Sequence, residues 1–330
     1  MVKIGLIGCG FMGGTHLSAY EQLQASGKFK VTAIADLDVK RAEKYAAKLG
    51  AKIYANGEEL LEKADVNTVD ICLPTYLHFQ FAYKAIEKGY NVFIEKPLCL
   101  HAKDADKLAD FAEKKGIIAM VGQCIRFWDE YVYLKEIYDS KTYGNVVNAS
   151  FKRLSPRPTW GWNNWLLDAN LSGGAAQDLH IHDSDYMLHL FGEPKNINTI
   201  KNTKGEKNSY IMTICNYSDF AVSIEGTWDL PSSFPFEMAY RVVFEKAVID
   251  FSSIKGIKIY TNDGKVIIPE IKKACRSSNE SGGNISDLGG YYNELSYFVD
   301  CLYNNKKVER ATLKDGAKAV NFIKKELGEK

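Results

Sequence analysis

The sequence predicts an α/β protein: an N-terminal doubly wound parallel sheet, followed by a C-terminal α+β domain with an open, mainly antiparallel sheet. Two observations carry this prediction. Up to about residue 122, short β-branched runs alternate with amphipathic stretches, as parallel strands alternate with their covering helices. Beyond residue 144, strand-like runs follow one another directly, with turn sequences such as TNDGK between them. Because a chain of 330 residues suits two domains, we place them at 1–122 and 123–330.

The first domain is expected to contain six strands separated by helices. Each strand candidate is nearly all apolar, as strands covered on both faces are. Several helical stretches end at a glycine (Gly50, Gly89 and Gly116), which suits a left-handed helix stop. The expected strands are Val2–Ile7, Val31–Ala35, Ala51–Tyr54, Val69–Leu73, Asn91–Ile94 and Ile117–Val121, and the expected helices include Val39–Leu49, Phe79–Lys88 and Lys103–Lys115.

The second domain is expected to consist of strands in succession, with its helices grouped apart from them. One helix is predicted around Ala175–Leu190, and two more at Gly290–Tyr303 and Leu313–Leu327. The last of these, within 312–327, is expected to pack back on the first domain. The segment Lys272–Leu288, rich in Ser, Asn and Gly, is predicted to be a loop. The expected strands are Asn145–Leu154, Ser209–Tyr217, Phe220–Trp228, Ala239–Glu245, Ala247–Phe251 and Lys258–Tyr260.

Composition argues against nucleic-acid and membrane partners. Lys and Arg number 42 against 41 Asp and Glu, so the formal net charge of +1 provides no basic field to attract nucleic acid. The sequence begins with a strand-like run, and its apolar stretches are short for a bilayer span, so we expect neither a signal peptide nor a membrane anchor. Seven cysteines without a CxxC pair indicate free thiols. We therefore expect a water-soluble cytoplasmic protein.

A glycine-rich turn, GCGFMG, follows the first expected strand and opens a helix. Its glycines at 8, 10 and 13 suit a tight turn, close approach of the backbone to a pyrophosphate, and close helix–strand packing. The second expected strand ends at Asp36, whose carboxylate can accept the ribose hydroxyls of a dinucleotide and would repel a 2′-phosphate. This favours NAD over NADP, although Lys40 and Arg41 keep NADP open. A glycine-rich turn without a ligand is the less favoured alternative.

Further candidate residues follow the fourth and fifth expected strands, at the edge where doubly wound sheets bind ligands. Lys96, in the tripeptide EKP, could hold a substrate hydroxyl and stabilise charge on it, or it could be a plain surface lysine. His78 opens the helix after the fourth strand and either lines the nicotinamide side or sits in the first turn. The residues expected to bind the cofactor are Gly8, Gly10, Phe11, Met12, Gly13, Asp36, Pro74, Thr75, His78, Glu95 and Lys96.

The segment GGAAQDLHIHD carries the second group of candidates. On a helix, Asp178 and His182 are four residues apart and share a face. A histidine beside a carboxylate can take the proton that leaves when hydride is removed from a secondary alcohol. The HIHDSD run is partly similar to the HxHxDH run of metal-dependent hydrolases, but the spacing differs, and we expect no metal site. A hydrogen-bonded pair of core histidines, His180 and His182, is the main alternative.

Several residues are candidates for contact with a sugar-like substrate. Aromatic faces with interleaved amides, as in the run WGWNNW, suit a sugar ring, although loop tryptophans are as often packing residues. Arg153 and Arg157 are weaker candidates of the same kind. The substrate candidates are Arg126, Trp160, Trp162, Trp165 and His180.

With these motifs in order, the chain resembles the glucose–fructose oxidoreductase/inositol dehydrogenase/rhizopine-catabolism (Gfo/Idh/MocA) family over nearly its whole length. The resemblance lies in IGLIGCGFMGGTHLSAY, LPTYLH, NVFIEKPL, SGGAAQDLHIHDSDYMLHLFGEP, GYYNELSYFVDCL and TLKDGAKAV. It implies a Rossmann domain, a C-terminal domain whose open sheet forms homodimers or homotetramers, and catalytic roles for Lys96, Asp178 and His182. Two departures are Tyr76, where the family often has Asn, and His180, where it commonly has Gly.

The function that the resemblance implies is NAD(P)-dependent hydride transfer to or from a hydroxyl-bearing carbon of a sugar, polyol or inositol-like substrate. Lys96 would position the oxygen, His182 would exchange its proton, and Asp178 would orient His182. One alternative is a non-catalytic dinucleotide-binding redox sensor. Another is an enzyme that retains NAD and cycles it between two substrates.

Overall fold

The computed structural model describes residues 1–202, 208–271 and 288–329, which form two compact units. The first unit comprises Met1–Phe127 and the described part of Ala274–Val320, and the second comprises the described parts of Trp128–Lys273 and Asn321–Lys330. Helix α10 (Leu313–Leu327) therefore has residues in both units. The loop predicted at 272–288 lies, apart from residue 288, outside the described residues.

The first unit is built on a six-stranded parallel sheet, which confirms the predicted doubly wound fold. Its strand order is β3-β2-β1-β4-β5-β6, so the chain leaves β1 in one direction and returns to β4 on its other side. That reversal places the ends of β1 and β4 at a topological switch point, where such sheets bind ligands. The strands are β1 Val2–Ile7, β2 Phe29–Ala35, β3 Lys52–Tyr54, β4 Thr68–Ile71, β5 Asn91–Glu95 and β6 Ala119–Gly122.

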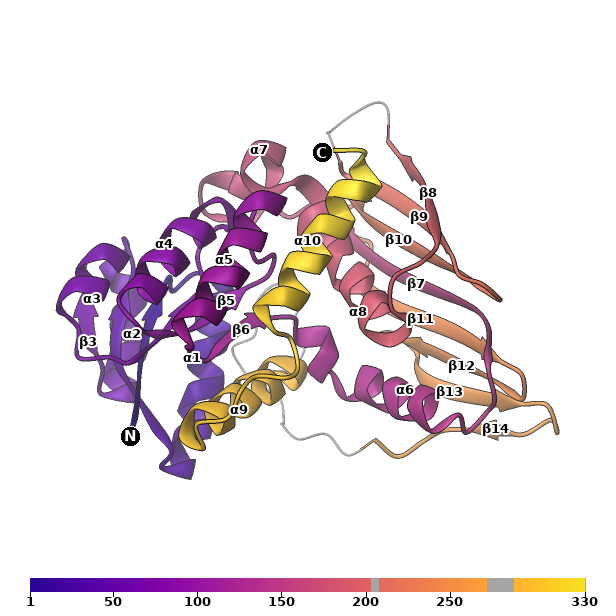
Figure 1. Cartoon of the computed structure of the whole chain (residues 1–330), viewed down its shortest axis with the longest axis horizontal. Coiled ribbons are helices and arrows are strands. Elements are labelled where there is room, and N and C mark those ends of the chain that lie inside the picture. The colour runs from indigo at the N-terminus through magenta and orange to yellow at the C-terminus, as the bar shows by residue number, and fades with distance from the viewer. Residues whose placement is uncertain (203–207, 272–287, 330) are drawn as a thin grey trace. The chain divides into compact units, whose positions relative to one another are not determined.

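Helices cover both faces of this sheet (Figure 1). Helix α1 packs against α2 and α9, whereas α4 packs against α3 and α5. The predicted helix stops are present, since Gly50, Gly89 and Gly116 all have positive φ angles, of 68°, 81° and 65°. The helical segments are α1 Phe11–Leu23, η1 Gln24–Ser26, α2 Val39–Leu49, α3 Gly57–Lys63, α4 Thr75–Glu87, α5 Ala102–Lys115, η2 Cys124–Phe127 and α9 Gly289–Tyr303.

The second unit is built on an eight-stranded sheet in the order β14-β13-β12-β11-β7-β10-β9-β8. Only β7 and β10 pair in parallel, so the sheet is mainly antiparallel, as predicted. The sequence had not indicated the edge strands β8 and β14. The strands are β7 Val146–Pro156, β8 Asn196–Lys201, β9 Tyr210–Asn216, β10 Ala221–Leu230, β11 Glu237–Phe244, β12 Ala247–Ser252, β13 Gly256–Thr261 and β14 Val266–Ile267.

Helices pack on one face of the eight-stranded sheet. The predicted helix at 175–190 is a π-helical segment, η4 (Ala176–His180), that continues into α8 (Ile181–Phe191). The segment η4 contacts β7, β9 and β10, and α8 contacts β7. An aromatic core joins Tyr131 of α6 (Asp129–Ser140) to Tyr186 of α8 and Tyr240 of β11 through edge-on ring contacts. The short segments η3 (Trp162–Leu167) and α7 (Ala169–Ser172) complete the described elements of the unit.

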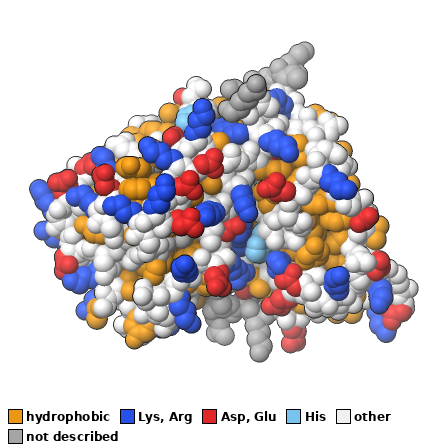
Figure 2. Space-filling view, in the orientation of Figure 1, with side chains coloured by type: hydrophobic (Ala, Val, Ile, Leu, Met, Phe, Trp, Pro, Cys, Tyr) orange, Lys and Arg blue, Asp and Glu red, His pale blue; other side chains and the backbone are white. Residues whose placement is uncertain are grey.

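The surface carries charges of both signs, as the nearly equal numbers of basic and acidic residues predict. On the face shown in Figure 2, basic and acidic side chains are interspersed rather than gathered into fields of one sign. Among the described residues, no helix combines the length and apolar character needed to cross a membrane. The six described cysteines are free thiols, and all are buried.

Candidate functional site

The glycine-rich turn connects β1 to α1, and each of its glycines occupies a distinct environment. Gly8 has a φ of 96°, a left-handed conformation that a side chain would strain. A Cβ added to Gly13 would lie 1.7 Å from the carbonyl oxygen of Gly8, so the helix packs on the turn too closely for any side chain. A Cβ added to Gly10 would meet nothing within 4 Å, so the turn is open to an approaching group at that position. This cradle fits the pyrophosphate of a dinucleotide.

The carboxylate of Asp36, directly after β2, lies against this turn. Its Oδ2 accepts a hydrogen bond from the backbone N–H of Cys9 at 2.6 Å, and its Oδ1 accepts one from the backbone N–H of Asp38 at 2.7 Å. The sequence-predicted acid and the glycine turn are thus brought together. Arg41 forms an ion pair with Asp38, with 3.3 Å between Nε and Oδ2. Burial and the charge of Asp36 raise the pKa of the Cys9 thiol to about 12, so this cysteine stays protonated.

Lys96 follows β5 on a backbone turn held from both sides. Its backbone N–H donates to Oε2 of Glu95 at 3.0 Å. Nδ1 of His78 lies 2.8 Å from the carbonyl oxygen of the next residue, Pro97, and Nε2 of His78 lies 2.7 Å from the carbonyl oxygen of Leu73. His78 therefore links the segment after β4 to the segment after β5.

The position of His78 agrees with one of its two predicted alternatives, a place in the first turn of the helix. Helix α4 begins at Thr75, and the His78 ring, 1% exposed, points inward to two backbone carbonyls. Burial lowers the pKa of this imidazole below its ordinary value of 6.5. Its two ring nitrogens are thus engaged with backbone oxygens, which counts against direct contact with a nicotinamide.

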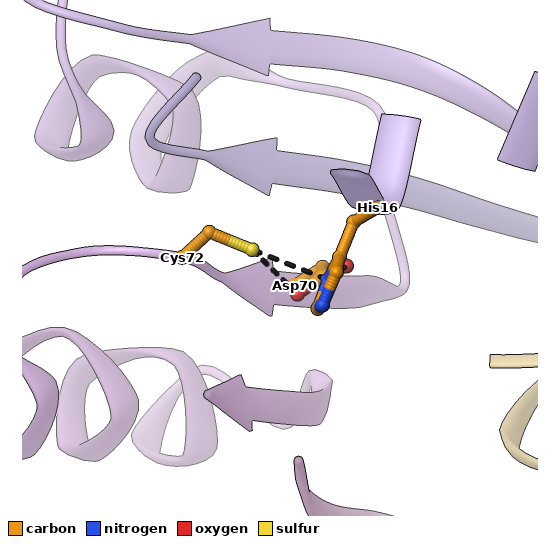
Figure 3. A group of neighbouring side chains, drawn as sticks. All are labelled: His16, Asp70 and Cys72. Carbon is orange, nitrogen blue, oxygen red and sulfur yellow. Dashed lines mark hydrogen bonds and ion pairs between the residues drawn. The ribbon is translucent and has the colours of Figure 1, made fainter. Parts of the chain in front are cut away.

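A buried polar cluster lies beneath these segments, and the sequence had given no indication of it beyond its separate members. The ring of His16, on α1, lies between the carboxylates of Asp70 on β4 and Glu95 on β5, with N···O distances of 2.8 and 2.9 Å. Figure 3 shows His16, Asp70 and Cys72 converging, with Sγ of Cys72 lying 3.2 Å from Nδ1 of His16. The hydroxyl of Tyr20 donates to Asp70 at 2.9 Å. These contacts form a hydrogen-bonded cluster of His16, Tyr20, Asp70, Cys72 and Glu95.

Burial and neighbouring groups shift the pKa values of His16 and of Glu294, which lies beside this cluster. Burial lowers the pKa of His16, but the Asp70 and Cys72 side chains together outweigh burial and hold that pKa well above 6.5. Glu294, on α9, is fully buried beside Glu95 and His16. Burial, followed by the charge of Glu95, raises the pKa of Glu294 well above its ordinary value of 4.5. Both shifts favour the protonated form, which is a cation for His16 and a neutral acid for Glu294.

In the second unit, Asp178 and His182 belong to the continuous helical stretch formed by η4 and α8. Asp178 is half-buried within the π-helical segment, and His182 is 8% exposed in the first turn of α8. The sequence argument assumed an α-helix through both residues, whereas the segment around Asp178 is π-helical. Single π-helical turns occur frequently at functional sites.

His180 has a different surrounding from the one predicted for a substrate contact. Its side chain has no exposed surface, and its Nε2 lies 3.0 Å from Oε1 of Glu326 on α10. The other oxygen of Glu326 accepts from the hydroxyl of Ser184 at 3.3 Å. On the opposite side, a Cβ at Gly226 would lie 2.7 Å from the Cβ of His180. This enclosed position argues against a direct contact between His180 and a substrate.

The remaining substrate candidates differ in exposure. Trp160 and Trp162 are 44% and 45% exposed, and Trp165 is half-buried in η3. Arg126 belongs to the first unit and is 4% exposed, and its Nη1 lies 3.3 Å from Oδ2 of Asp315. Arg153 is buried in an ion pair with Asp183, at 2.9 Å between Nε and Oδ2, so its guanidinium serves the core of the second unit.

Two protein-family models match the chain. Residues 2–123 match the Gfo/Idh/MocA oxidoreductase family model with its NAD-binding Rossmann fold, and residues 131–250 match the Gfo/Idh/MocA C-terminal domain model.

Curated relatives of the chain include named dehydrogenases. A myo-inositol 2-dehydrogenase of Thermotoga maritima is 31% identical over 58% of this chain and 55% of its own length. An uncharacterised oxidoreductase of Streptococcus pneumoniae is 30% identical over 58% of this chain and 51% of its own. The chain thus spans about half the length of these relatives. An inositol 2-dehydrogenase of Pseudarthrobacter chlorophenolicus is 26% identical over 91% of this chain and 85% of its own.

Solved structures share the fold. An oxidoreductase from Agrobacterium radiobacter, in complex with NAD+, L-tartaric acid and magnesium, superimposes with a TM-score of 0.83 at 17% identity, covering 98% of this chain and 94% of its own. A levoglucosan dehydrogenase, in complex with NADH and levoglucosan, gives 0.81 at 20% identity, covering 99% and 96%.

Proposed function

The chain belongs to the Gfo/Idh/MocA oxidoreductase family, and from this premise we propose that it transfers a hydride between NAD and a hydroxyl-bearing carbon of a sugar, polyol or inositol-like substrate. The observation that carries the proposal is the Asp36 carboxylate lying 2.6 Å from the N–H of Cys9, beside a turn open at Gly10. A dinucleotide needs both features, since its pyrophosphate approaches the turn while its ribose hydroxyls reach the acid.

Residues of the first unit would hold the cofactor. The N-terminus of α1 offers backbone N–H groups to the pyrophosphate, and Gly10 leaves room for it. Asp36 would bind the adenosine ribose and disfavour a 2′-phosphate, and the pairing of Arg41 with Asp38 reduces the availability of that guanidinium to a phosphate. The nicotinamide, when bound, supplies the hydride acceptor or donor.

Three side chains would carry the proton chemistry. Lys96 would position the substrate oxygen and stabilise its developing negative charge. His182 would accept the hydroxyl proton during oxidation and return it during reduction, and Asp178 would orient that imidazole or bind a neighbouring hydroxyl. These assignments rest on the family resemblance together with the helical placement of Asp178 and His182.

The substrate class follows from the relatives and from the tryptophan-rich segment. Relatives named as inositol and levoglucosan dehydrogenases act on cyclic polyols or sugars. In this chain the half-exposed rings of Trp160 and Trp162 provide flat apolar surfaces of the kind that sugar rings stack on.

The eight-stranded sheet supports a homo-oligomer. The outward positions Ile200, Met212 and Ile214 are neighbours across β8 and β9, and Ile200 is 62% exposed. Farther along the sheet, Tyr260 is 42% exposed. We propose that this face pairs with a second copy, as a homodimer or within a homotetramer in the cytoplasm. Sedimentation of the wild type and of Ile214→Lys tests this, since a lysine in the interface would produce monomers.

Screening inositols, aldoses and anhydrosugars with NAD, while following the absorbance of reduced nicotinamide, tests the function. Net reduction of added NAD by one of these classes is the expected result. Reduced nicotinamide that stays bound and is reoxidised only by a second substrate would favour the enzyme with retained NAD. Binding without turnover of any polyol would favour the redox sensor.

A further inference from the structure

We propose that His16 is a positioning residue for Lys96: a buried imidazolium that holds the Glu95 carboxylate against the backbone N–H of Lys96. The proposal deepens the proposed function and rests on it for the role of Lys96. It assigns a task to a cluster that lies within the first unit and of which Glu95 alone was a candidate for the cofactor site.

The Glu95 carboxylate connects the His16 ring to the backbone of Lys96. Oε1 of Glu95 lies 2.9 Å from Nε2 of His16, and Oε2 of the same group accepts the backbone N–H of Lys96 at 3.0 Å. Both side chains are buried, His16 completely and Glu95 to 4% exposure. A Cβ added to Gly122 of β6 would lie 3.3 Å from Cδ of Glu95, so the carboxylate also has little space to move sideways. Displacing His16 should therefore displace the turn that carries Lys96.

The hydrogen-bond partners of the ring determine its protonation. Nδ1 faces Oδ2 of Asp70 at 2.8 Å while Nε2 faces Glu95, and ionised carboxylates can only accept hydrogen bonds. A neutral imidazole carries one proton and would direct a lone pair at one of the two carboxylates. Satisfying both requires a proton on each nitrogen. With both carboxylates as acceptors, the geometry favours a ring that is protonated on both nitrogens.

Glu294 is a further titratable group that lies beside the cluster. Among the described residues, neither of its carboxyl oxygens has a hydrogen-bond partner, and one of them lies within 4.8 Å of the ligating atoms of His16 and Glu95. A third ionised carboxylate here would compete with Glu95 for His16 and repel it. Glu294 therefore serves the arrangement as a neutral acid, which leaves His16 to Asp70 and Glu95.

The consequence concerns how the proposed site is assembled. His16 lies on α1, the helix that opens at the glycine turn, and Glu95 ends β5 directly before Lys96. The His16–Glu95 contact thus ties the cofactor-binding helix to the lysine that would position the substrate oxygen. Sub-ångström placement of such a lysine matters, because small misplacements of reacting groups cost up to about a hundredfold in rate.

The first test determines the protonation of the His16 ring directly and does not depend on catalytic turnover. Long-range nitrogen–proton NMR spectra of the full-length, cofactor-free protein should show both His16 nitrogens protonated at neutral and mildly alkaline pH. A neutral ring with one bare nitrogen at neutral pH would overturn the proposal. So would a stoichiometric metal ion in the purified protein that takes a ring nitrogen as ligand.

The second test uses two amide variants, each of which can retain the hydrogen bond of one of the two ring nitrogens of His16. The amide nitrogen of His16→Gln lies near the position of Nε2 and can still donate to Glu95, whereas that of His16→Asn lies near Nδ1 and can donate only to Asp70. We expect kcat to fall about tenfold further in His16→Asn than in His16→Gln, with similar KM for NAD and similar melting temperatures. Tyr20→Phe removes a hydrogen bond to the same oxygen of Asp70 and leaves the contact between His16 and Glu95 in place, so it should lower kcat less than His16→Asn does.

Equal losses of kcat in the two variants, in step with their losses of stability, would show that His16 is only structural. If the wild type turns over no polyol, the proposed function fails, and the backbone amide signal of Lys96 then decides the positioning claim. That signal should shift strongly upfield in His16→Asn and little in His16→Gln, and an unchanged signal in both would refute the claim.

Discussion

The carboxylate of Asp36 accepts a hydrogen bond from the backbone N–H of Cys9 at 2.6 Å, which joins the end of β2 to the middle of the glycine turn. The two residues are 27 positions apart in the chain, and the parallel pairing of β1 with β2 brings them together. We propose that a carboxylate in this place selects an adenosine ribose without a 2′-phosphate.

Replacing Asp36 by serine should change the preference between the two dinucleotides. Loss of a charged acceptor for the ribose hydroxyls should raise the KM for NAD by roughly ten- to a hundredfold, as hydrogen bonds to charged groups are worth about 1.5–3 kcal/mol. The same change removes the repulsion of a 2′-phosphate, so the KM for NADP should fall. Steady-state kinetics with both cofactors measure the effect. Asp38→Ser, two residues along in the same loop, is the control and should leave the NAD value nearly unchanged.

His182→Ala should reduce turnover by about a hundred- to ten-thousandfold while leaving the affinity for NADH close to wild type, because the imidazole would act on the substrate proton and not on the cofactor. Single-turnover rates and fluorescence titration with NADH measure the two quantities. His189→Ala, on the same helix, is the matched control. Near-wild-type turnover in His182→Ala would remove this residue from the mechanism.

Gly226→Ala should destabilise the second unit by about 1–3 kcal/mol, since the new methyl group would lie 2.7 Å from Cβ of His180. Urea unfolding monitored by tryptophan fluorescence measures the loss. His180→Gly removes the clashing atom, so Gly226→Ala should cost much less in that background. Equal costs in the two backgrounds would show that the contact between residues 180 and 226 is relaxed in solution.

Glu294→Gln should stabilise the protein increasingly as pH rises. The folded state holds the Glu294 proton at pH values where the unfolded chain, with a carboxyl pKa near 4.5, has released it. The wild type therefore loses stability as pH rises above that value towards the raised folded pKa, and the amide variant lacks this loss. Melting temperatures across mildly acidic to alkaline pH measure the difference. Parallel curves for the two proteins would mean that Glu294 titrates normally.

Local patterns in the sequence predicted most of the secondary structure. Helices α2 and α10 have the predicted bounds, because a periodic apolar face with clear ends is a local property. Strand β8 was missed because its sequence, NINTIK, is polar and its residues are exposed or half-buried at the sheet edge. The π-helical turn at η4 was missed because it differs from an α-helix in hydrogen-bond register rather than in residue pattern.

The candidate site likewise contains residues that the sequence predicted and residues that it did not. The glycine turn and Asp36 were predictable because their spacing belongs to one local βαβ unit. The cluster around His16 was not, since Asp70 and Glu95 are 54 and 79 residues away from it in the chain. An aspartate inside the apolar run TVDIC indicates a buried charge that needs a partner, but sequence alone does not identify that partner.

Each unit combines segments that lie far apart in the sequence, and this affects the order in which the protein can fold during synthesis. Helix α9 packs on α1 and β1, and Glu326 contacts His180, which precedes it by 146 positions in the chain. Neither unit can finish its core on the ribosome until the stretch from α9 to α10 has left the exit tunnel. Until then the six-stranded sheet lacks α9 over one face, and an unpartnered His180 faces Gly226. We therefore expect nascent chains stalled before residue 288 to be protease-sensitive and bound by chaperones, and both properties to disappear together once α10 is released.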